Sequence, residues 1–399
     1  MSKRFLAALA LAGTAILAPP EVRAEEVLKI GALLIDTGPL AGFYEGHVRA
    51  LELAETDLNE NRAPGAPRIE IRRATYAGTP ETALQAASRL AKEDRVQVIT
   101  GMMPSSTSII LAARAEALNV AVLDGFAQAA SLTGEHCRKN YFHIATTDHL
   151  VLSAYDQMIA EQGPISWDIL AADYTTGRNA SESFQKMAAA HGASIGHVAY
   201  APLGTSDFGT SITQLAASPS KGLFISTFGS DAISFAKQQR QFKLDQKYDI
   251  ILGHSYITRT TLGGQADNVV GNYQTFGWLA DFPTEDSRTF ADRYADKFNA
   301  IPDYVAADQY IAVQAAQAAA QKAGSLQAAN IASALPGLTF RSLLGELTIR
   351  AEDHQLLRPV VISQVVMTDG KPDLAVQTIV PWEKVAGNPN PECKLGSAS

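Results

Sequence analysis

The sequence holds 399 residues, of which 46% are hydrophobic, 19% charged and 8% aromatic, and its formal net charge is -8. This composition excludes a disordered chain, a collagen and a small disulfide-stapled domain. The acidic excess argues against nucleic-acid binding, which depends on Lys and Arg facing phosphates. The length suffices for two or three domain-sized units, each with its own core.

The first 24 residues have the pattern of a targeting segment rather than of a fold. Lys3 and Arg4 precede an apolar run from Phe5 to Ala18 of about fourteen residues, whereas a membrane-spanning helix needs roughly 20. Two prolines end the run, and the small residues up to Ala24 fit a signal-peptidase site. We predict a signal peptide over residues 1–24 and export of residues 25–399, with an uncleaved anchor as the alternative. The exported form has a charge of about -10.

Export changes the interpretation of the two cysteines, Cys137 and Cys393. An oxidising compartment permits a disulfide between them, and such a bridge would tie the C-terminal tail to the body. They are too far apart in the sequence for a CxxC redox site. The alternative is two separate thiols, one of them in the tail.

The chain alternates short apolar runs with amphipathic stretches, which is typical of strands covered on both faces and of the helices that cover them. The predicted strands are Leu28–Ile35, Ile69–Tyr76, Val96–Thr100, Val120–Asp124, Ile165–Ala171, Ile195–Tyr200, Leu223–Thr227, Ile250–Leu252 and Tyr273–Trp278. The predicted helices are Tyr44–Asn61, Glu81–Asp94, Thr107–Leu118, His149–Gln162, Arg178–His191, Asp231–Phe242, Asp286–Phe298 and Asp303–Ala323. This alternation predicts an α/β fold with doubly wound parallel sheets, and the length predicts two lobes.

The last part of the chain has a different pattern. Strands without helices are predicted at Leu343–Arg350, Val360–Thr368 and Ala375–Val380. From Gly387 onward the sequence is rich in Pro, Asn, Gly and Ser, which predicts a poorly ordered tail.

In open parallel sheets, ligands bind beyond the carboxyl ends of the strands, where helix N-termini present free N–H groups. One such exit carries Ser105 and Ser106 just before a predicted helix, so hydroxyls and amides there suit a carboxylate or carbonyl. Phe43, Tyr44 and Phe126 follow other exits and form an apolar wall. The alternative interpretation is that the serines only cap a helix and the aromatic residues belong to the core.

Catalytic and cofactor motifs are absent from the sequence. It contains no GxxxxGK[ST] loop, no GxGxxG after a strand, no GxSxG elbow and no HExxH. His136, Cys137 and His143 match no common zinc spacing. We therefore expect a binding protein rather than an enzyme, with no cofactor and no metal.

More specific motifs indicate a family. The opening Leu28–Gly31, Gly38–Gly42 and Gly46 resembles that of the periplasmic leucine/isoleucine/valine-binding proteins, the type I solute receptors of ABC importers. The resemblance covers most of residues 27–382. It continues through Glu81–Asp94, Gly101–Thr107, Asp173–Gly177, Phe228–Gln239, Phe290–Ala300, Pro302–Gly324 and Arg350–Gln355.

The resemblance implies two α/β lobes that are joined by three hinge crossings and close on a small molecule. Lobe 1 would comprise residues 27–146 and 279–343, lobe 2 residues 147–278 and 344–382, and a tail residues 383–399. It also implies a periplasmic location, an ABC permease complex as partner and a monomer.

The resemblance places ligand contacts on particular residues. The helix-start serines that hold a carboxylate in the family correspond to Ser105 and Ser106. The remaining expected contacts are Phe43, Tyr44, Phe126, Gln128, Thr176, which replaces a family aromatic, and Phe228. The acidic residue that pairs with a ligand ammonium falls on Val270, so an α-amino group lacks its usual counterion unless Asp231 substitutes.

The expected function is therefore capture of an amino acid, branched-chain or neutral, for an importer. Aromatic acids or short amides rank second, because of Phe43, Tyr44, Phe126 and the missing acid. A sensor that passes the signal to a kinase or receptor is an alternative to transport, and an exported hydrolase lacks a nucleophile.

Overall fold

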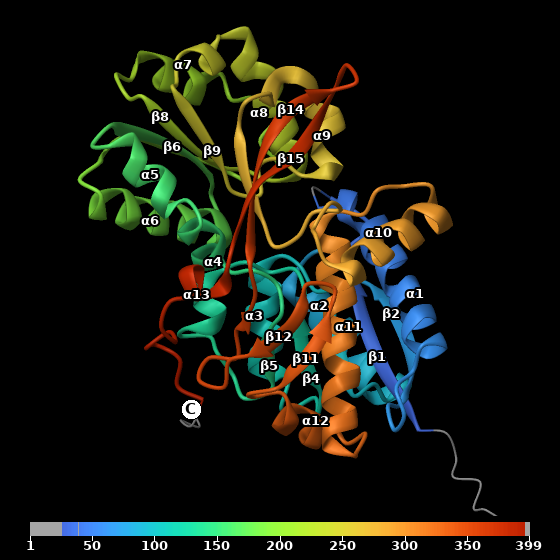
Figure 1. The fold of residues 1–399 in the computed structure, drawn as a ribbon. Helices are drawn as coiled ribbons and strands as arrows, with labels where there is room; N and C mark the ends of the chain where they lie inside the picture. Colours follow the sequence, from blue (N-terminus) through green and yellow to red (C-terminus); the bar gives the residue numbers. More distant parts are fainter. Residues whose placement is uncertain (1–25, 39, 396–399) are drawn as a thin grey trace, which may run out of the picture.

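The computed structural model describes residues 26–38 and 40–395, and the predicted signal peptide lies outside them. The helices and strands form two α/β lobes, with the lobe that contains β1 below the other in Figure 1. The predicted α/β fold class with parallel sheets is confirmed. No helix in this described part is both long and apolar enough to cross a membrane.

Lobe 1 is built on a five-stranded parallel sheet with the order β2-β1-β3-β4-β5. Its strands are β1 (Val27–Leu34), β2 (Arg68–Thr75), β3 (Val98–Thr100), β4 (Ala121–Asp124) and β5 (Tyr141–His143). Its longer helices are α1 (Tyr44–Glu60), α2 (Pro80–Arg89), α3 (Ser105–Arg114), α10 (Glu285–Phe298), α11 (Tyr304–Ala323) and α12 (Ala328–Ala334). Because α2 and α11 both pack against β1, most of that strand is buried, as its apolar sequence predicts.

Lobe 2 is built on a seven-stranded sheet with the order β15-β14-β10-β9-β8-β6-β7. Its strands are β6 (Ser166–Ala172), β7 (Ser194–Ala201), β8 (Gly222–Ser226), β9 (Ile250–Gly253), β10 (Tyr273–Phe276), β14 (Val360–Thr368) and β15 (Lys371–Val380), of which β14 and β15 run antiparallel to their neighbours. Its helices are α4 (Asp148–Ser153), α5 (Asp156–Gln162), α6 (Thr175–Ala190), α7 (Gly209–Ala217), α8 (Gly229–Gln241), α9 (Arg259–Gln265) and α13 (Trp382–Val385).

A small third sheet corrects one predicted boundary. Strands β11 (Thr339–Ser342), β12 (Gly345–Ile349) and β13 (Leu356–Leu357) pair in sequence order, and Gln355 forms a bridge to His143, the last residue of β5. The predicted change of lobe between residues 343 and 344 falls inside the β11–β12 hairpin and is therefore too early. The chain joins the lobe 2 sheet only at β14, because the hairpin pairs within itself and next to lobe 1.

One buried arginine fastens the three crossings between the lobes. Arg358, in the crossing from β13 to β14, donates to the carbonyl oxygens of Ile144 and Gly277, each at 3.1 Å. Ile144 lies in the crossing that follows β5, and Gly277 lies in the crossing that follows β10. The same guanidinium pairs with Asp308 of α11 at 2.6 Å, and both side chains are fully buried. Burial raises the pKa of the Asp308 carboxyl to about 6, against the opposing effect of Arg358.

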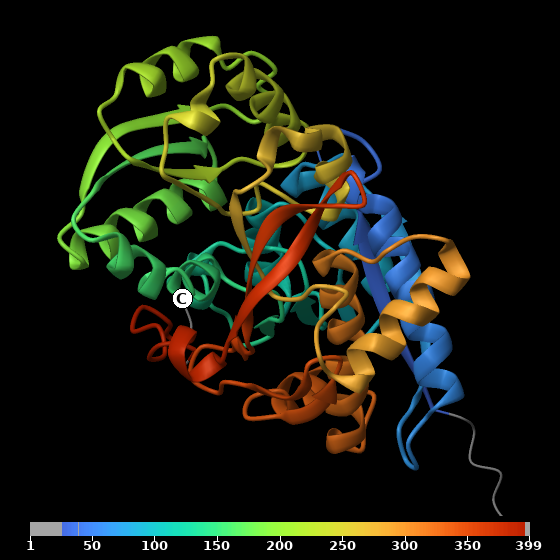
Figure 2. The same cartoon turned by 45° about the horizontal axis from the view of Figure 1, so that its top comes forward.

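The C-terminal tail is better defined than its composition predicts. Residues 387–395 contain no helix or strand, yet the segment is held by hydrogen bonds and by a disulfide between Cys137 and Cys393. The sequence left open whether these cysteines pair. Figures 1 and 2 both show this segment beside the junction of the lobes, next to α4 and α13.

Candidate ligand-binding site

The N-termini of four long helices converge between the lobes. Ser105 begins α3 and Tyr304 begins α11 in lobe 1, whereas Thr176 lies in the first turn of α6 and Phe228 directly precedes α8 in lobe 2. Three of these helices, α3, α6 and α8, directly follow the carboxyl ends of parallel strands. The alternating strand–helix sequence therefore brings their starts together.

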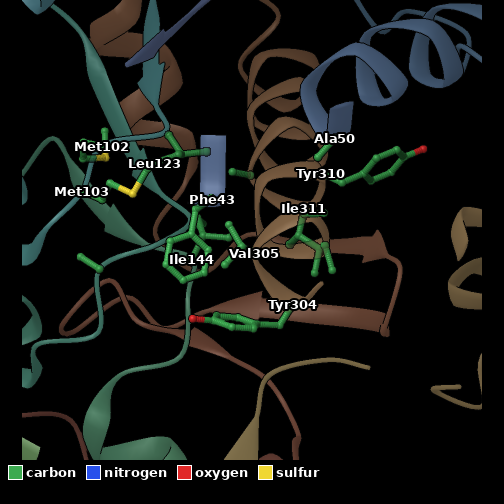
Figure 3. Packing of buried hydrophobic residues seen from close by; sticks show 14 of the residues in the cluster. Phe43, Ala50, Met102, Met103, Leu123, Ile144, Tyr304, Val305, Tyr310 and Ile311 are labelled. Carbon is green, nitrogen blue, oxygen red and sulfur yellow. The ribbon is translucent and has the colours of Figure 1, made fainter. Parts of the chain in front are cut away.

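Five of the eleven described residues that line this cleft are aromatic. The described residues that line it are Leu40, Phe43, Pro104, Ser105, Phe126, Ala127, Gln128, Tyr174, Thr176, Phe228 and Tyr304. Phe43 and Phe126 pack edge to face at 5.3 Å, and Tyr174 and Phe228 meet at 5.3 Å from the other lobe. Figure 3 shows Phe43 beside Ile144 and Val305, with the Tyr304 ring just beyond them.

The lobes are closed on one another in this structure. The enclosed cavity measures about 20 Å³, room for about one water molecule. The Oγ atom of Ser105 lies 2.8 Å from Oγ1 of Thr176, so the starts of α3 and α6 touch across the cleft. Ser255 of lobe 2 donates to Oε1 of Gln128 at 2.5 Å. A solute can enter only when these cross-lobe bonds break and the lobes separate.

Three of the converging helices lack a side-chain cap. Pro104, Tyr174 and Phe228 occupy the cap positions of α3, α6 and α8, and none of them makes a capping hydrogen bond. The first N–H groups of a helix have no partner within the helix, and the helix dipole makes this end partly positive. Three uncapped starts aimed at one cleft therefore favour an anion, and a carboxylate suits them well.

Two phenols add neutral hydrogen-bonding groups to the wall. Burial raises the pKa of Tyr174 well above its ordinary value, and the charges of Asp148 and Asp231 act in the same direction. Burial likewise raises the pKa of Tyr304. Both hydroxyls therefore stay protonated at neutral pH and can donate a hydrogen bond to a ligand.

A buried histidine–aspartate pair lies behind Phe228. The Nε2 atom of His254 lies 3.0 Å from Oδ1 of Asp148, and its Nδ1 lies 3.0 Å from Oγ of Ser226. The His254 ring also packs edge to face on Phe228 at 6.0 Å. The Asp148 carboxyl faces His254 and is not among the described residues that line the cleft.

A second buried histidine supports the lobe 1 wall. His47 of α1 is fully buried, and its ring packs edge to face on Phe126 at 5.7 Å. Neither ring nitrogen has a hydrogen-bond partner among the described residues. Burial lowers the pKa of His47 to about 3, so the ring is neutral at physiological pH.

The structure brings together six of the nine residues expected from the sequence. The six that line the cleft are Phe43, Ser105, Phe126, Gln128, Thr176 and Phe228. Three others lie outside its lining. Tyr44 packs half-buried against the lobe 1 core, and Ser106 is half-buried in the first turn of α3. Asp231 accepts backbone hydrogen bonds from Gly204 at 2.8 Å and Thr205 at 3.3 Å.

The position assigned to the ammonium-pairing acid is wrong. Val270 is 38% exposed and precedes β10 at its amino end, whereas the cleft lies beyond the carboxyl ends of the strands. The expectation that a ligand ammonium lacks a counterion therefore no longer depends on Val270. It depends on the lining of the cleft, which has no acidic residue among the described residues.

Sequence reasoning missed Tyr174 and Tyr304, the two phenols of the wall. Tyr174 directly follows a predicted strand, so the exit rule that found Ser105 could also have found it. Tyr304 follows Asp303, whose Oδ1 accepts from the Tyr304 N–H at 2.8 Å. An aspartate at this position signals a helix start, and this signal could have pointed to Tyr304. Among the residues described, no group of three or more His, Cys, Asp and Glu could hold a metal ion.

The family described as "periplasmic binding protein" matches residues 27–371. The chain belongs to this family. Its members are solute-binding proteins rather than enzymes, in agreement with the absence of catalytic motifs from the sequence.

Solved structures share the fold over nearly the whole chain. A closed leucine-, isoleucine-, valine-, threonine- and alanine-binding protein from Brucella ovis has a TM-score of 0.83 at 18% identity, covering 94% of this chain and 100% of that one. An ABC-transporter solute-binding protein from Rhodopseudomonas palustris BisB5, in complex with 3,4-dihydroxybenzoic acid, has a TM-score of 0.81 at 20% identity, covering 89% and 97%. Another from R. palustris, in complex with benzoate, has a TM-score of 0.81 at 17% identity, covering 92% and 100%. At these identities the likeness concerns the fold.

Proposed function

We propose that this protein is the exported solute receptor of an ABC importer and that its cleft binds an aromatic carboxylic acid. The observation that carries the ligand class is the meeting of uncapped helix starts with aromatic walls in a cleft that lacks an acidic lining residue. A carboxylate satisfies the N–H groups of α3, α6 and α8 together with the Ser105 and Thr176 hydroxyls. The ligand ring packs between the Phe43–Phe126 pair and the Tyr174–Phe228 pair.

The substituents of such a ring also have partners. Tyr174, Tyr304 and Gln128 line the cleft and offer protonated hydroxyls and an amide. These groups can accept a hydrogen bond from a ring hydroxyl or donate one to it. Two of the similar structures named above hold benzoate or 3,4-dihydroxybenzoic acid, which is consistent with this ligand class.

As a ligand class, branched-chain or neutral amino acids come first by the sequence resemblance but second to aromatic acids by the geometry of the cleft. Its carboxylate fits the same helix starts, and the similar Brucella protein is named for leucine, isoleucine and valine. Its ammonium, however, meets no free acid, because Asp148 pairs with His254 and Asp231 binds the backbone of Gly204. Burying an unpaired ammonium is costly, so an amino acid binds less well. A short amide lacks the negative charge that the uncapped helix starts favour.

A thermal-shift screen of the exported protein tests this assignment. The panel contains benzoate, 4-hydroxybenzoate, 3,4-dihydroxybenzoate, benzamide and the neutral amino acids. A ligand at a hundred times its Kd adds about 2.7 kcal/mol to stability, which raises the melting temperature measurably. We expect the benzoates to stabilise the protein and benzamide not to. Stabilisation by leucine or valine without any effect of the benzoates would contradict the proposal.

The transport role is tested separately from the ligand. A transport receptor binds a permease complex, whereas a sensor binds a kinase or receptor. Genes for permease and ATPase subunits beside this one, and loss of aromatic-acid uptake on deletion, are the results expected for transport. Unchanged uptake with a lost transcriptional response would indicate a sensor.

A further inference from the structure

The C-terminal segment leaves lobe 2 from a well-buried anchor. Strand β15 ends at Val380, and α13 then packs against α4. Val385 and Ala386 are fully buried, and they share the lobe 2 core with Leu150 and Val151 of α4. This end of the segment therefore moves with lobe 2 and α4.

The same segment ends on lobe 1. Arg350, directly after β12, donates to the carbonyl oxygen of Gly387 at 2.9 Å and is paired with Asp353 at 2.7 Å. The Asp353 carboxylate accepts from the Asn390 N–H at 3.0 Å. The disulfide then joins Cys393 to Cys137, which is buried in the turn before β5 of the lobe 1 sheet.

Between these two anchors the segment lines an open cavity rather than a packed core. The cavity has a volume of about 640 Å³ and lies between helices α4 and α6 of lobe 2, the Arg350–Asp353 pair of lobe 1 and the tail itself. Because little apolar surface is buried here, the tail depends on the disulfide and the few hydrogen bonds around Arg350 to stay on lobe 1. The bridge links positions 256 residues apart, so it closes most of the chain into one loop.

We propose that the disulfide-closed tail is a fourth covalent connection between the lobes and that it restricts their opening. The three backbone crossings meet at Arg358 and form the hinge, whereas the tail bridges the lobes beside α4. Separating the lobes moves Val385 away from Cys137, which stretches residues 387–392 and breaks the hydrogen bonds to Arg350 and Asp353. The connection is satisfied in the closed arrangement, so it raises the fraction of closed molecules and with it the apparent ligand affinity.

Small-angle X-ray scattering of the ligand-free protein tests this proposal without any knowledge of the ligand. The oxidised protein is compared with the protein reduced by dithiothreitol. Two electrons and two protons pass from dithiothreitol to the Cys137 and Cys393 sulfurs, which become thiols while dithiothreitol closes to its own disulfide. A Cys137→Ser/Cys393→Ser variant and a variant that ends at Ala386 remove the connection permanently. A variant that ends at Cys393 keeps the bridge and serves as the matched control.

We expect a larger radius of gyration for the reduced protein, the double serine variant and the variant that ends at Ala386, and the oxidised value for the control. If the double serine variant does not fold, the reduced protein and the Ala386 variant carry the test. Scattering curves that coincide with that of the oxidised protein, with only the melting temperature lowered, would overturn the proposal and leave the bridge as a staple of the tail. With a binding ligand in hand, the double serine variant should also show an affinity at least about fivefold lower.

Discussion

The hinge and the cleft of this protein join the same two lobes by opposite means. At the hinge, the charged Arg358–Asp308 pair is fully buried and holds carbonyl groups of two other crossings. In the cleft, the lobes meet through hydrogen bonds between neutral side chains, Ser105 with Thr176 and Ser255 with Gln128, and beside it Thr260 donates to the Asp303 carboxylate at 3.1 Å. Breaking a buried charge pair is costly, whereas a neutral hydrogen bond contributes little net stability. The difference shows how one junction stays fixed while the other opens and closes.

The largest expected effect comes from the hinge. Replacement of Arg358 by Met leaves the Asp308 carboxyl buried without its partner, and we expect a loss of about 3–5 kcal/mol in unfolding free energy. Urea denaturation measures it. Arg341→Met is the matched control, because that arginine is highly exposed where it pairs with Asp286, and its removal should leave the midpoint nearly unchanged. Equal midpoints for the two variants would mean that the hinge is no stronger than a surface ion pair.

If Arg358→Met does not yield folded protein, Arg358→Lys carries the test. Lysine keeps the charge but replaces the two-armed guanidinium with a single ammonium group. We expect an intermediate loss of stability. Wild-type stability in this variant would show that the carbonyl bonds to Ile144 and Gly277 contribute nothing.

In the cleft, Ser105 is expected to matter for binding rather than for folding. Ser105→Ala removes a donor to the ligand carboxylate, and a hydrogen bond to a charged group contributes about 1.5–3 kcal/mol. Affinity for 4-hydroxybenzoate should therefore fall by about 10- to 100-fold in calorimetric titration. Ser108→Ala, on the same helix, removes a fully buried hydroxyl and should leave affinity unchanged. Equal affinities for both variants would place the carboxylate elsewhere.

The cleft wall also predicts an acid sensitivity that the hinge does not share. The His47 pKa is about 3 in the folded protein, below the ordinary value of 6.5 in the unfolded chain. Below pH 6.5 the histidine is protonated in the unfolded chain but stays neutral in the folded protein. The unfolding free energy therefore falls by about 1.4 kcal/mol for each pH unit of acidification.

Replacement of His47 by Leu should flatten this dependence by about 2 kcal/mol between pH 6.5 and 5, because leucine binds no proton. Denaturation curves across this pH range measure the change. His197→Gln, at a half-buried histidine of β7, is the control and should retain the wild-type slope. An unchanged slope in His47→Leu would mean that water or a partner reaches the ring.

The smallest expected effect is at Ser255. Ser255→Ala removes its bond to Gln128 across the cleft, and a neutral hydrogen bond contributes about 0.5–1.5 kcal/mol. The closed arrangement loses that much, so affinity for 4-hydroxybenzoate should fall by about 2- to 10-fold with little change in melting temperature. A loss of stability as large as that of Arg358→Met would erase the contrast between cleft and hinge.

The sequence predicts the parts of this molecule that follow from local pattern. Residues in the loops that leave predicted strands, such as Ser105, Phe126 and Gln128, lie in the cleft because parallel strands bring their carboxyl ends to one edge. Val270 failed because the family resemblance, and not a strand exit, placed the acid there; the start of β10 at Tyr273 was predicted correctly, and Val270 lies before it. Asp231 failed because its partners, Gly204 and Thr205, are distant in the sequence.

The contacts that form the hinge could not be predicted from local sequence pattern. Arg358 follows two leucines and precedes a proline, and nothing nearby indicates that it binds carbonyl groups of Ile144 and Gly277. Its role depends on three crossings that meet in space, which only the tertiary fold provides. The pairing of Cys137 with Cys393 has the same character, since the sequence shows two cysteines but not their distance.

Calorimetric titration of residues 25–399 with 4-hydroxybenzoate and, in a parallel experiment, with leucine tests the central claim most directly. A cleft with uncapped helix starts, aromatic walls and no free acid should bind 4-hydroxybenzoate with one-to-one stoichiometry and give no binding heat with leucine. Saturable binding of leucine without binding of 4-hydroxybenzoate or benzoate would contradict the account, because it would require a counterion for the ammonium in a cleft with no acidic residue among its described lining residues.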